Sequence, residues 1–112
     1  MIYELRTYTA APGKLKELHQ RFREHTLRAF ARNGFEVIGF WEPVQSETVQ
    51  TGNKELVYLL AFPDQAARDT AWAAMEIDPE WSKARAESKR NGILVESVTS
   101  RMMQPTDYSP LK

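Results

Sequence analysis

The pattern of apolar and polar positions predicts four β-strands. Residues 2–10 alternate in polarity and are rich in β-branched and aromatic side chains, which is typical of a strand. Three later segments share this composition and are bounded by turn-forming residues: FEVIGFWEPV (35–44), KELVYLLAF (54–62) and ILVESVTSRMM (93–103). A polar loop with Gly52 and Asn53 joins the second and third segments, so we expect them to form an antiparallel hairpin.

Helical periodicity fills the intervals between these strands. Over 14–33, apolar side chains recur at three- and four-residue steps and form one stripe, at Leu15, Leu18, Phe22, Ala29 and Phe30. Asp64 stands where the N-cap of a second helix is expected, ahead of 65–76. Asp78 precedes a proline that suits the first turn of a further helical segment over 79–89.

The order strand, helix, strand, strand, helix, strand is typical of a ferredoxin-like α+β fold, βαββαβ, built from two split βαβ units. The whole chain, 1–112, then forms a single domain with a four-stranded antiparallel sheet. The first strand is expected between the third and the fourth. Right-handed crossovers place both helical segments on the same face of the sheet, so the chain itself leaves the other face uncovered.

The strands are apolar on both faces, and this predicts a homodimer. Alternate residues of the third strand form two apolar sets, Val57, Leu59 and Ala61 against Leu56, Tyr58, Leu60 and Phe62; in the second strand we expect Val37 and Trp41 to oppose Ile38 and Phe40. A sheet with one solvated face would instead alternate apolar and polar residues. Soluble monomers rarely expose an apolar patch of this size, so we expect a second copy of the sheet to cover it, forming a dimeric α+β barrel.

Five short segments resemble the NIPSNAP family: MIYELRTYTAAPGK (1–14), GFWEP (39–43), YLLAFP (58–63), DPEW (78–81) and PTDYSP (105–110). Together they extend over nearly the whole chain. The resemblance implies a ferredoxin-like dimeric α+β barrel, related in fold to antibiotic biosynthesis monooxygenases, muconolactone isomerases and stress-responsive barrel proteins. It implies no catalytic motif, because a fold alone does not give function.

The C-terminal tail, QPTDYSPLK, contains two prolines and shows no periodicity. The prolines prevent it from continuing the fourth strand, and Tyr108 is its only large anchor. Its match to the family's C-terminal motif predicts that the tail packs across its own domain or across the partner's.

Composition narrows the possible locations and partners. The chain has no cysteine, which excludes disulfides, thiolate metal sites and cysteine nucleophiles and suits a reducing cytoplasm. Fifteen basic residues balance fifteen acidic ones, so the protein lacks the positive field that attracts nucleic acid, and we expect no nucleic-acid partner. No apolar run is long enough for a membrane span, and no leader segment is recognisable, so we expect a soluble cytoplasmic protein.

The common catalytic and cofactor motifs are missing. The glycine patterns that bind phosphates and dinucleotides do not occur. His19 and His25 are the only histidines, and their six-residue separation turns them about 120° apart around a helix, so they cannot hold one metal together. We expect no metal site and no bound cofactor.

One candidate site lies on the helix side of the sheet. His25 stands at the edge of the apolar stripe, where an imidazole could act as a general acid or base, and we expect Phe22, Tyr58 and Trp41 to line a ligand pocket beside it. The structural alternative is a boundary histidine bonded to a backbone carbonyl. We favour this site because small-molecule pockets are mostly apolar, with a few converging polar groups.

The other candidate is a polar layer on the barrel side. Glu4, Arg6 and Tyr8 share one face of the central strand, where buried charges must be paired. The layer either fixes the register of the dimer or anchors an acidic small molecule, with Tyr8 as a donor.

Three functions remain open. The protein is a homodimeric small-molecule-binding or accessory protein, a cofactor-independent enzyme of monooxygenase or isomerase type acting on a small, partly apolar substrate, or a structural oligomer with a solid core. A cavity between the helices and the sheet would favour the first two.

Overall fold

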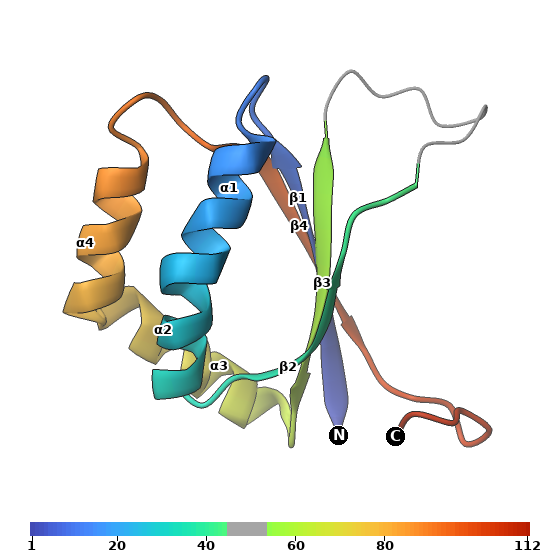
Figure 1. Ribbon diagram of the computed structural model, residues 1–112. Coiled ribbons are helices and arrows are strands. Elements are labelled where there is room, and N and C mark those ends of the chain that lie inside the picture. Colours follow the sequence, from blue (N-terminus) through green and yellow to red (C-terminus); the bar gives the residue numbers. More distant parts are fainter. Residues whose placement is uncertain (45–53) are drawn as a thin grey trace.

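The computed structural model describes residues 1–44 and 54–112 and has the predicted ferredoxin-like topology (Figure 1). The elements, in chain order, are β1 (Ile2–Ala10), α1 (Leu15–Arg21), the π-helical turn η1 (Phe22–Thr26), α2 (Leu27–Arg32), β2 (Glu36–Trp41), β3 (Glu55–Phe62), α3 (Gln65–Ile77), α4 (Pro79–Ser88) and β4 (Val95–Met103). The antiparallel sheet has the order β2-β3-β1-β4, so β1 is central as expected. The loop predicted around Gly52 and Asn53 lies outside the described residues.

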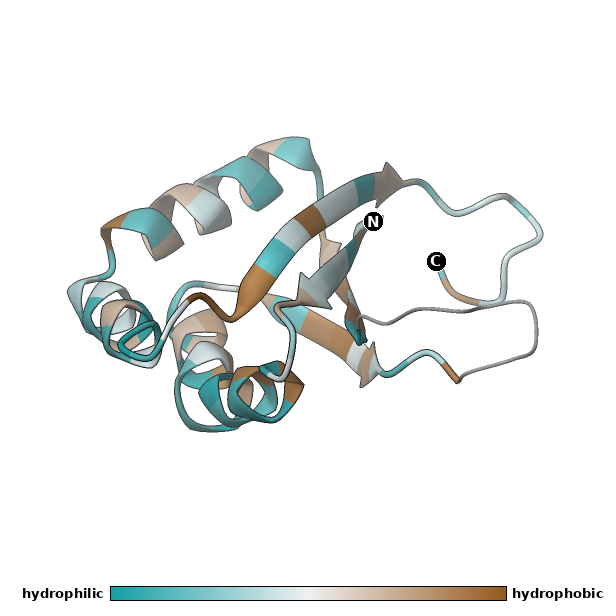
Figure 2. Cartoon of the chain, turned by 90° about the horizontal axis from the view of Figure 1, so that it is seen from above, coloured by the Kyte–Doolittle hydropathy of each residue, from teal (hydrophilic) through white to brown (hydrophobic). Residues whose placement is uncertain are grey.

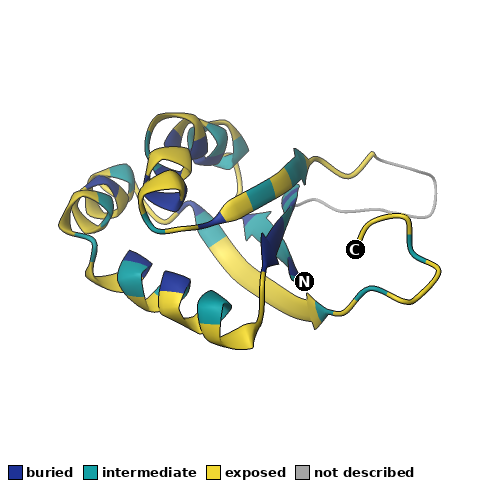
Figure 3. Ribbon diagram, turned by 90° about the horizontal axis from the view of Figure 1, so that it is seen from below, coloured by how far each residue is buried: buried dark blue, intermediate teal, exposed yellow. Residues whose placement is uncertain are grey.

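The helices cover only one face of the sheet, which we call the helix side (Figure 1). The helix-side residues of β3 are buried in the core: Leu56, Tyr58, Leu60 and Phe62. On the other face, which we call the open face, Val57 and Leu59 are only half-buried and pair with Thr7 and Leu5 of β1. The edge strand β4 is exposed along almost its whole length (Figure 3) and mixes hydrophobic and hydrophilic residues (Figure 2).

A shift in register changes the faces of β2. The pairing with β3 is interrupted between Val37 and Gly39, and a glycine inside a strand often accompanies such an irregularity. Val37 and Phe40 therefore both lie on the helix side, where they pack against the core, while Gly39 and Trp41 pair toward the open face. The prediction that Val37 shares a face with Trp41, opposite Ile38 and Phe40, is wrong because the extra residue breaks the two-residue alternation.

Gly39 also makes room for the neighbouring indole. A Cβ atom at this position would lie 2.9 Å from Cη2 of Trp41, closer than side-chain atoms normally approach. Trp41 is 51% exposed, whereas Phe40 contacts the rings of Phe22 and Tyr58. The adjacent aromatic residues of this strand thus have different roles, one in the core and one at the surface of the edge strand.

The long helix predicted over 14–33 is interrupted by the π-helical turn η1. The N–H of Leu27 bonds to the carbonyl of Phe22, five residues earlier, so one extra residue is accommodated. Thr26 consequently takes the buried position and His25 is only half-buried. No helix in the described residues has the length and apolar character needed to span a bilayer.

Both predicted N-caps are confirmed. The Asp64 carboxylate accepts a hydrogen bond from the Ala67 N–H at 2.8 Å, and Asp78 accepts one from the Trp81 N–H at 3.0 Å. Asp78 also binds the side chains of Arg32 and Asn33, which joins the end of α2 to the junction of α3 and α4. Local hydrogen-bonding residues therefore fix where α3 and α4 begin.

The C-terminal tail leaves the sheet without packing its aromatic anchor. Residues 104–112 form no helix or strand, and Tyr108 is 83% exposed. Figure 1 shows the tail extending away from the end of β4. The prediction that Tyr108 anchors the tail to its own domain is therefore wrong. Packing of the tail across a partner protomer stays a prediction.

Replacing Leu60 with Asp tests the assignment of the helix side. Leu60 is completely buried, so Leu60→Asp places a carboxylate among apolar side chains. We expect this change to lower the free energy of unfolding by about 4 kcal/mol or more, because an unpaired buried charge is among the most destabilising changes. Urea and thermal unfolding followed by circular dichroism measure the loss. A variant with parental stability would contradict the assignment.

Candidate ligand-binding site

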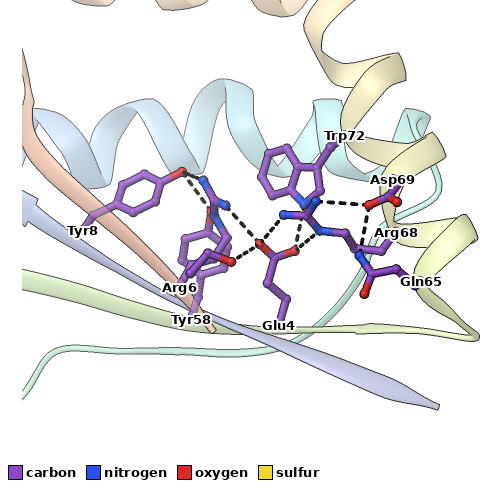
Figure 4. A network of polar contacts seen from close by, with 9 residues as sticks. Glu4, Arg6, Tyr8, Tyr58, Gln65, Arg68, Asp69 and Trp72 are labelled. Atoms are coloured by element: carbon purple, nitrogen blue, oxygen red, sulfur yellow. Dashed lines mark hydrogen bonds and ion pairs between the residues drawn. The ribbon is translucent and has the colours of Figure 1, made fainter. Parts of the chain in front are cut away.

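A buried carboxylate joins the sheet to helix α3. Glu4 has no exposed surface, and its Oε1 accepts hydrogen bonds from Arg68 Nε at 3.0 Å and Trp72 Nε1 at 2.8 Å. Its Oε2 accepts from Arg6 Nη1 and Arg68 Nη2, each at 3.0 Å, and from Ser100 Oγ at 2.6 Å (Figure 4). The charge of Glu4 is therefore fully paired, which a buried carboxylate requires.

The polar layer of Glu4, Arg6 and Tyr8 lies on the helix side, not on the barrel side as predicted. Glu4 pairs with Leu60 across the sheet and Arg6 pairs with Tyr58. Residues opposite each other in antiparallel strands share a face, and the faces of Leu60 and Tyr58 are buried beneath the helices. The strand register, which a single sequence does not determine, therefore places Arg6 and Tyr8 of the second candidate site beside Tyr58 of the first.

Hydrogen bonds continue from Glu4 through Arg6 to two tyrosines. Arg6 Nε donates to the Tyr58 hydroxyl at 2.8 Å, and Arg6 Nη2 donates to the Tyr8 hydroxyl at 3.3 Å. The Tyr58 hydroxyl donates to that of Tyr8 at 2.9 Å (Figure 4). Burial, together with the neighbouring Tyr8, raises the pKa of Tyr58 well above its ordinary value, so Tyr58 is a neutral donor.

The Tyr8 hydroxyl is positioned to donate to a ligand. It accepts hydrogen bonds from both Arg6 and Tyr58, and no acceptor for its own proton is found among residues 1–44 and 54–112. A hydroxyl carries one donor as well as its acceptor lone pairs. Tyr8 can therefore offer its proton to a molecule in the space beside it.

That space is a cavity of about 340 Å³ between the helices and the β1–β4 half of the sheet. Four apolar aromatic residues line it, Phe22, Phe30, Trp72 and Trp81, and polar groups reach it from Arg6, Tyr8 and Arg21. Exposed residues of α4, Ser82 and Arg85, and its C-cap Lys89 line it where it meets the surface. The volume and the mixture of apolar walls with a few polar groups are those of a small-molecule site.

Arg21, the last residue of α1, is the most unusual residue of the cavity. It is only 8% exposed, and its Nη1 donates to Ser88 Oγ at 3.3 Å. Its Nε is buried and has no hydrogen-bond partner within the described part of the chain. Burial, and the like charge of Arg85, lower the pKa of Arg21.

Sequence reasoning did not identify Arg21. The sequence does indicate that Arg21 is buried, because it follows Leu18 by three residues and therefore falls on the apolar stripe of the helix. A charged residue on such a stripe is unusual, since it must be buried. Its lack of a partner, however, depends on residues far away in the sequence.

The predicted group of His25, Phe22, Tyr58 and Trp41 does not form a single site. Phe22 lines the cavity, and its ring centroid lies 5.5 Å from that of Tyr58. His25 lies in a separate hollow between α1 and α4, because the π-helical turn gives the buried position to Thr26. Trp41 lies beyond the register shift of β2, in another hollow that it shares with His19.

The two histidines bind carboxylates at the surface. His19 pairs with Glu42, and His25 Nε2 lies 3.8 Å from Glu24 Oε2. Residues 1–44 and 54–112 contain no group of three or more His, Asp or Glu side chains that could hold a metal ion. The cavity is the region where the described side chains are best arranged to bind a molecule.

The Glu4 network makes the stability of the protein sensitive to acid. Although burial opposes ionisation, the hydrogen bonds from Arg68, Ser100, Trp72 and Arg6 lower the pKa of Glu4 from 4.5 to about 2. A lowered folded-state pKa adds stability above pH 4.5, here about 3 kcal/mol, and this is lost as the pH falls toward 2.

We therefore expect Glu4→Gln to be much less stable than the parent near neutral pH and to differ from it less in acid. The difference between their free energies of unfolding should narrow by about 2 kcal/mol between neutral pH and about pH 3. Urea unfolding of both proteins across this range measures it. A gap that stays constant with pH would show that the ionisation of Glu4 does not contribute to folding.

Comparison with solved structures places this fold among known proteins. The NIPSNAP family protein Atu4242 of Agrobacterium tumefaciens, whose function is unknown, is 26% identical, with a TM-score of 0.78 over 100% of this chain and 94% of that one. A second A. tumefaciens NIPSNAP family protein, Atu5224, is 23% identical, with a TM-score of 0.79 over 99% of this chain and 98% of that one.

An uncharacterised NIPSNAP domain protein of Burkholderia xenovorans is similar in fold at 20% identity, with a TM-score of 0.78 over 98% of this chain and 99% of that one. Among curated proteins, none matches the chain. The family model of NIPSNAP matches residues 3–110, which is nearly the full length of the sequence. The chain therefore belongs to the NIPSNAP family.

Proposed function

We propose that the protein is a homodimer in which each protomer binds a small, partly apolar molecule in the cavity between its helices and its sheet. The observation that carries this proposal is the cavity of about 340 Å³, in which aromatic and aliphatic side chains lie beside polar and charged ones. A structural oligomer with a solid core would have filled this volume with side chains.

The polar groups of the cavity are held in place before any ligand arrives. Arg6 is fixed by Glu4, Tyr58 and Tyr8, and Trp72 is fixed by its bond to Glu4. The Arg6 guanidinium also lies 4.2 Å from the centroid of the Trp72 ring. Groups that are already ordered lose little conformational entropy on binding, so this arrangement favours a binding site.

A cofactor-independent enzyme is the second candidate, and the Tyr8 hydroxyl is the observation that favours it. Its available proton and the adjacent guanidinium of Arg6 are suited to stabilise negative charge that develops on a bound substrate. A binding protein would release its ligand unchanged, whereas an enzyme would convert it. Mass spectrometry of a ligand recovered after incubation distinguishes the two.

The open face supports the dimer. Leu5, Val57 and Leu59 are half-buried there, and no helix covers them (Figure 1). They form an apolar region at the centre of the sheet, since Leu5 pairs with Leu59 and Val57 lies two residues along the same strand. A second copy of the same face, related by a twofold axis, would remove this surface from water.

Blocking the cavity tests the site. Ser82 is an exposed residue of α4 that lines it, and Ser82→Trp adds a large ring there. We expect compounds that raise the melting temperature of the parent to lose most of that effect in Ser82→Trp, because binding to the native state alone stabilises it. Thermal shift with a library of small aromatic and aliphatic compounds provides the measurement.

Lys83→Trp is the matched control, since Lys83 is the next exposed residue of α4 and does not line the cavity. It should keep the response of the parent. Equal responses in both variants would exclude the cavity as the binding site.

Replacing Leu59 with Asp tests the dimer. Leu59 is adjacent to the core residue Leu60 but lies on the open face. We expect Leu59→Asp to dissociate the dimer into folded monomers, because the new carboxylate would be desolvated only in the interface. Sedimentation velocity at micromolar concentration gives the mass of each species. A monomeric parent protein, or a Leu59→Asp variant that remains dimeric, would contradict an interface on this face.

A further inference from the structure

We propose that the ligand of the cavity is an organic carboxylate and that Arg21 binds its charged group. This inference rests on the small-molecule site proposed above and adds the chemistry of the ligand. The ligand has a small aromatic or aliphatic body that fills the apolar part of the cavity and one carboxylate that reaches Arg21.

Arg21 is a buried cation without a counterion. None of the ion pairs among residues 1–44 and 54–112 includes it, although only 8% of its surface is exposed. Its one hydrogen bond goes to the neutral hydroxyl of Ser88. A buried charge is costly unless it is paired, so an anion that enters the cavity would gain more here than at a solvated arginine.

The arginines at the other end of the polar layer show the contrast. Arg6 and Arg68 share the carboxylate of Glu4, which makes hydrogen bonds to both. The carboxylate that this face of the sheet provides is therefore already in use. Arg21 has been left with no such partner in the described protein.

The charges that line the cavity favour an anion. The cavity is lined by the basic residues Arg6, Arg21, Arg85 and Lys89 and by one acidic residue, Glu76. The pKa of Arg21 is affected by Arg85, which lowers it, and by Tyr8, which raises it, and both of these residues line the cavity. Arg21 therefore interacts electrostatically with residues of the cavity, and Arg85, which carries the same charge, repels it.

The guanidinium of Arg21 suits an anion. Nη1 is bound to Ser88, whereas Nε is unpartnered and no hydrogen bond from Nη2 is found in the described residues. Nη2 is therefore the donor that an anion in the cavity would reach, because Nε has no exposed surface in the unliganded protein, and a charge-assisted hydrogen bond to Nη2 would pair the guanidinium. Tyr8 supplies a further donor in the same cavity.

The remaining walls select the body of the ligand. Phe22, Phe30, Trp72 and Met75 present apolar surface, which a fully hydrated inorganic anion would not use. An aromatic or short aliphatic acid satisfies both the apolar walls and the guanidinium. The organic carboxylate is therefore favoured over free phosphate, and the experiment below separates the two.

The test compares acids with neutral amides of the same shape. Benzoate and phenylacetate are titrated into the full-length protein alongside benzamide, phenylacetamide and inorganic phosphate, with NMR detection of the arginine Nε–Hε signals. The Arg21 signal is assigned by its loss in Arg21→Lys. We expect at least one acid to shift this signal and to bind about tenfold or more tightly than its amide, because a charge-assisted pair is lost in the amide.

Arg21→Met should abolish the preference for the acid, and Arg23→Met, at an exposed position two residues along the same helical segment, should retain it. Amides that bind as well as acids, or an acid preference that survives in Arg21→Met, would overturn the inference and leave the proposed binding site standing. Phosphate that binds more tightly than either acid would also overturn it. Failure of every compound, neutral ones included, would count against the proposed small-molecule site itself.

A stability measurement separates a ligand-binding Arg21 from a structural one. If Arg21 is held unpaired for a ligand, Arg21→Met should raise the melting temperature of the unliganded protein, because it removes a desolvated charge and keeps an apolar stem of similar length. A melting temperature several degrees below that of the parent would assign Arg21 to folding and overturn the inference.

Discussion

The hydrogen-bonded carboxylate of Glu4 is the interaction on which the rest of the site depends. It lies on the central strand and receives donors from β1, from helix α3 and from the edge strand β4. Three elements that are distant in sequence are thereby fixed by one charged group (Figure 4). Because hydrogen bonds to a buried charge are strong and directional, the positions of Arg6 and Trp72 follow from that of Glu4.

The polar groups at one end of the cavity, near Glu4, have hydrogen-bond partners, whereas those of Arg21 at the other end are only partly paired. Near Glu4, every charge has a partner, and the hydrogen bonds continue without interruption to the hydroxyl of Tyr8. Near Arg21, a guanidinium is buried against Trp81 with a single neutral acceptor. The two ends of the cavity thus differ, since one polar network is complete and the adjacent cation has no counterion among the described residues.

Much of the fold could be predicted because its signals are local. The four strands and the N-caps Asp64 and Asp78 follow from patterns within short segments, and the central position of β1 follows from the order of these elements along the chain. The site was harder to predict because it depends on register. One extra residue in β2 reassigned the faces of Val37 and Trp41, and the pairing of Glu4 with Leu60 moved the polar layer to the helix side. Periodicity alone does not contain these offsets.

The π-helical turn has a consequence for how the first helical segment tolerates changes in length. The relative orientation of the buried residues before it, Leu18 and Arg21, and of those after it, Ala29 and Phe30, is set by the extra residue that η1 accommodates. Loss of that residue would rotate one half of the segment against the other by about 100°. A substitution here changes a single contact, whereas a deletion would change the angle between Arg21 and the residues after η1, so the shape of the cavity depends on the length of this segment.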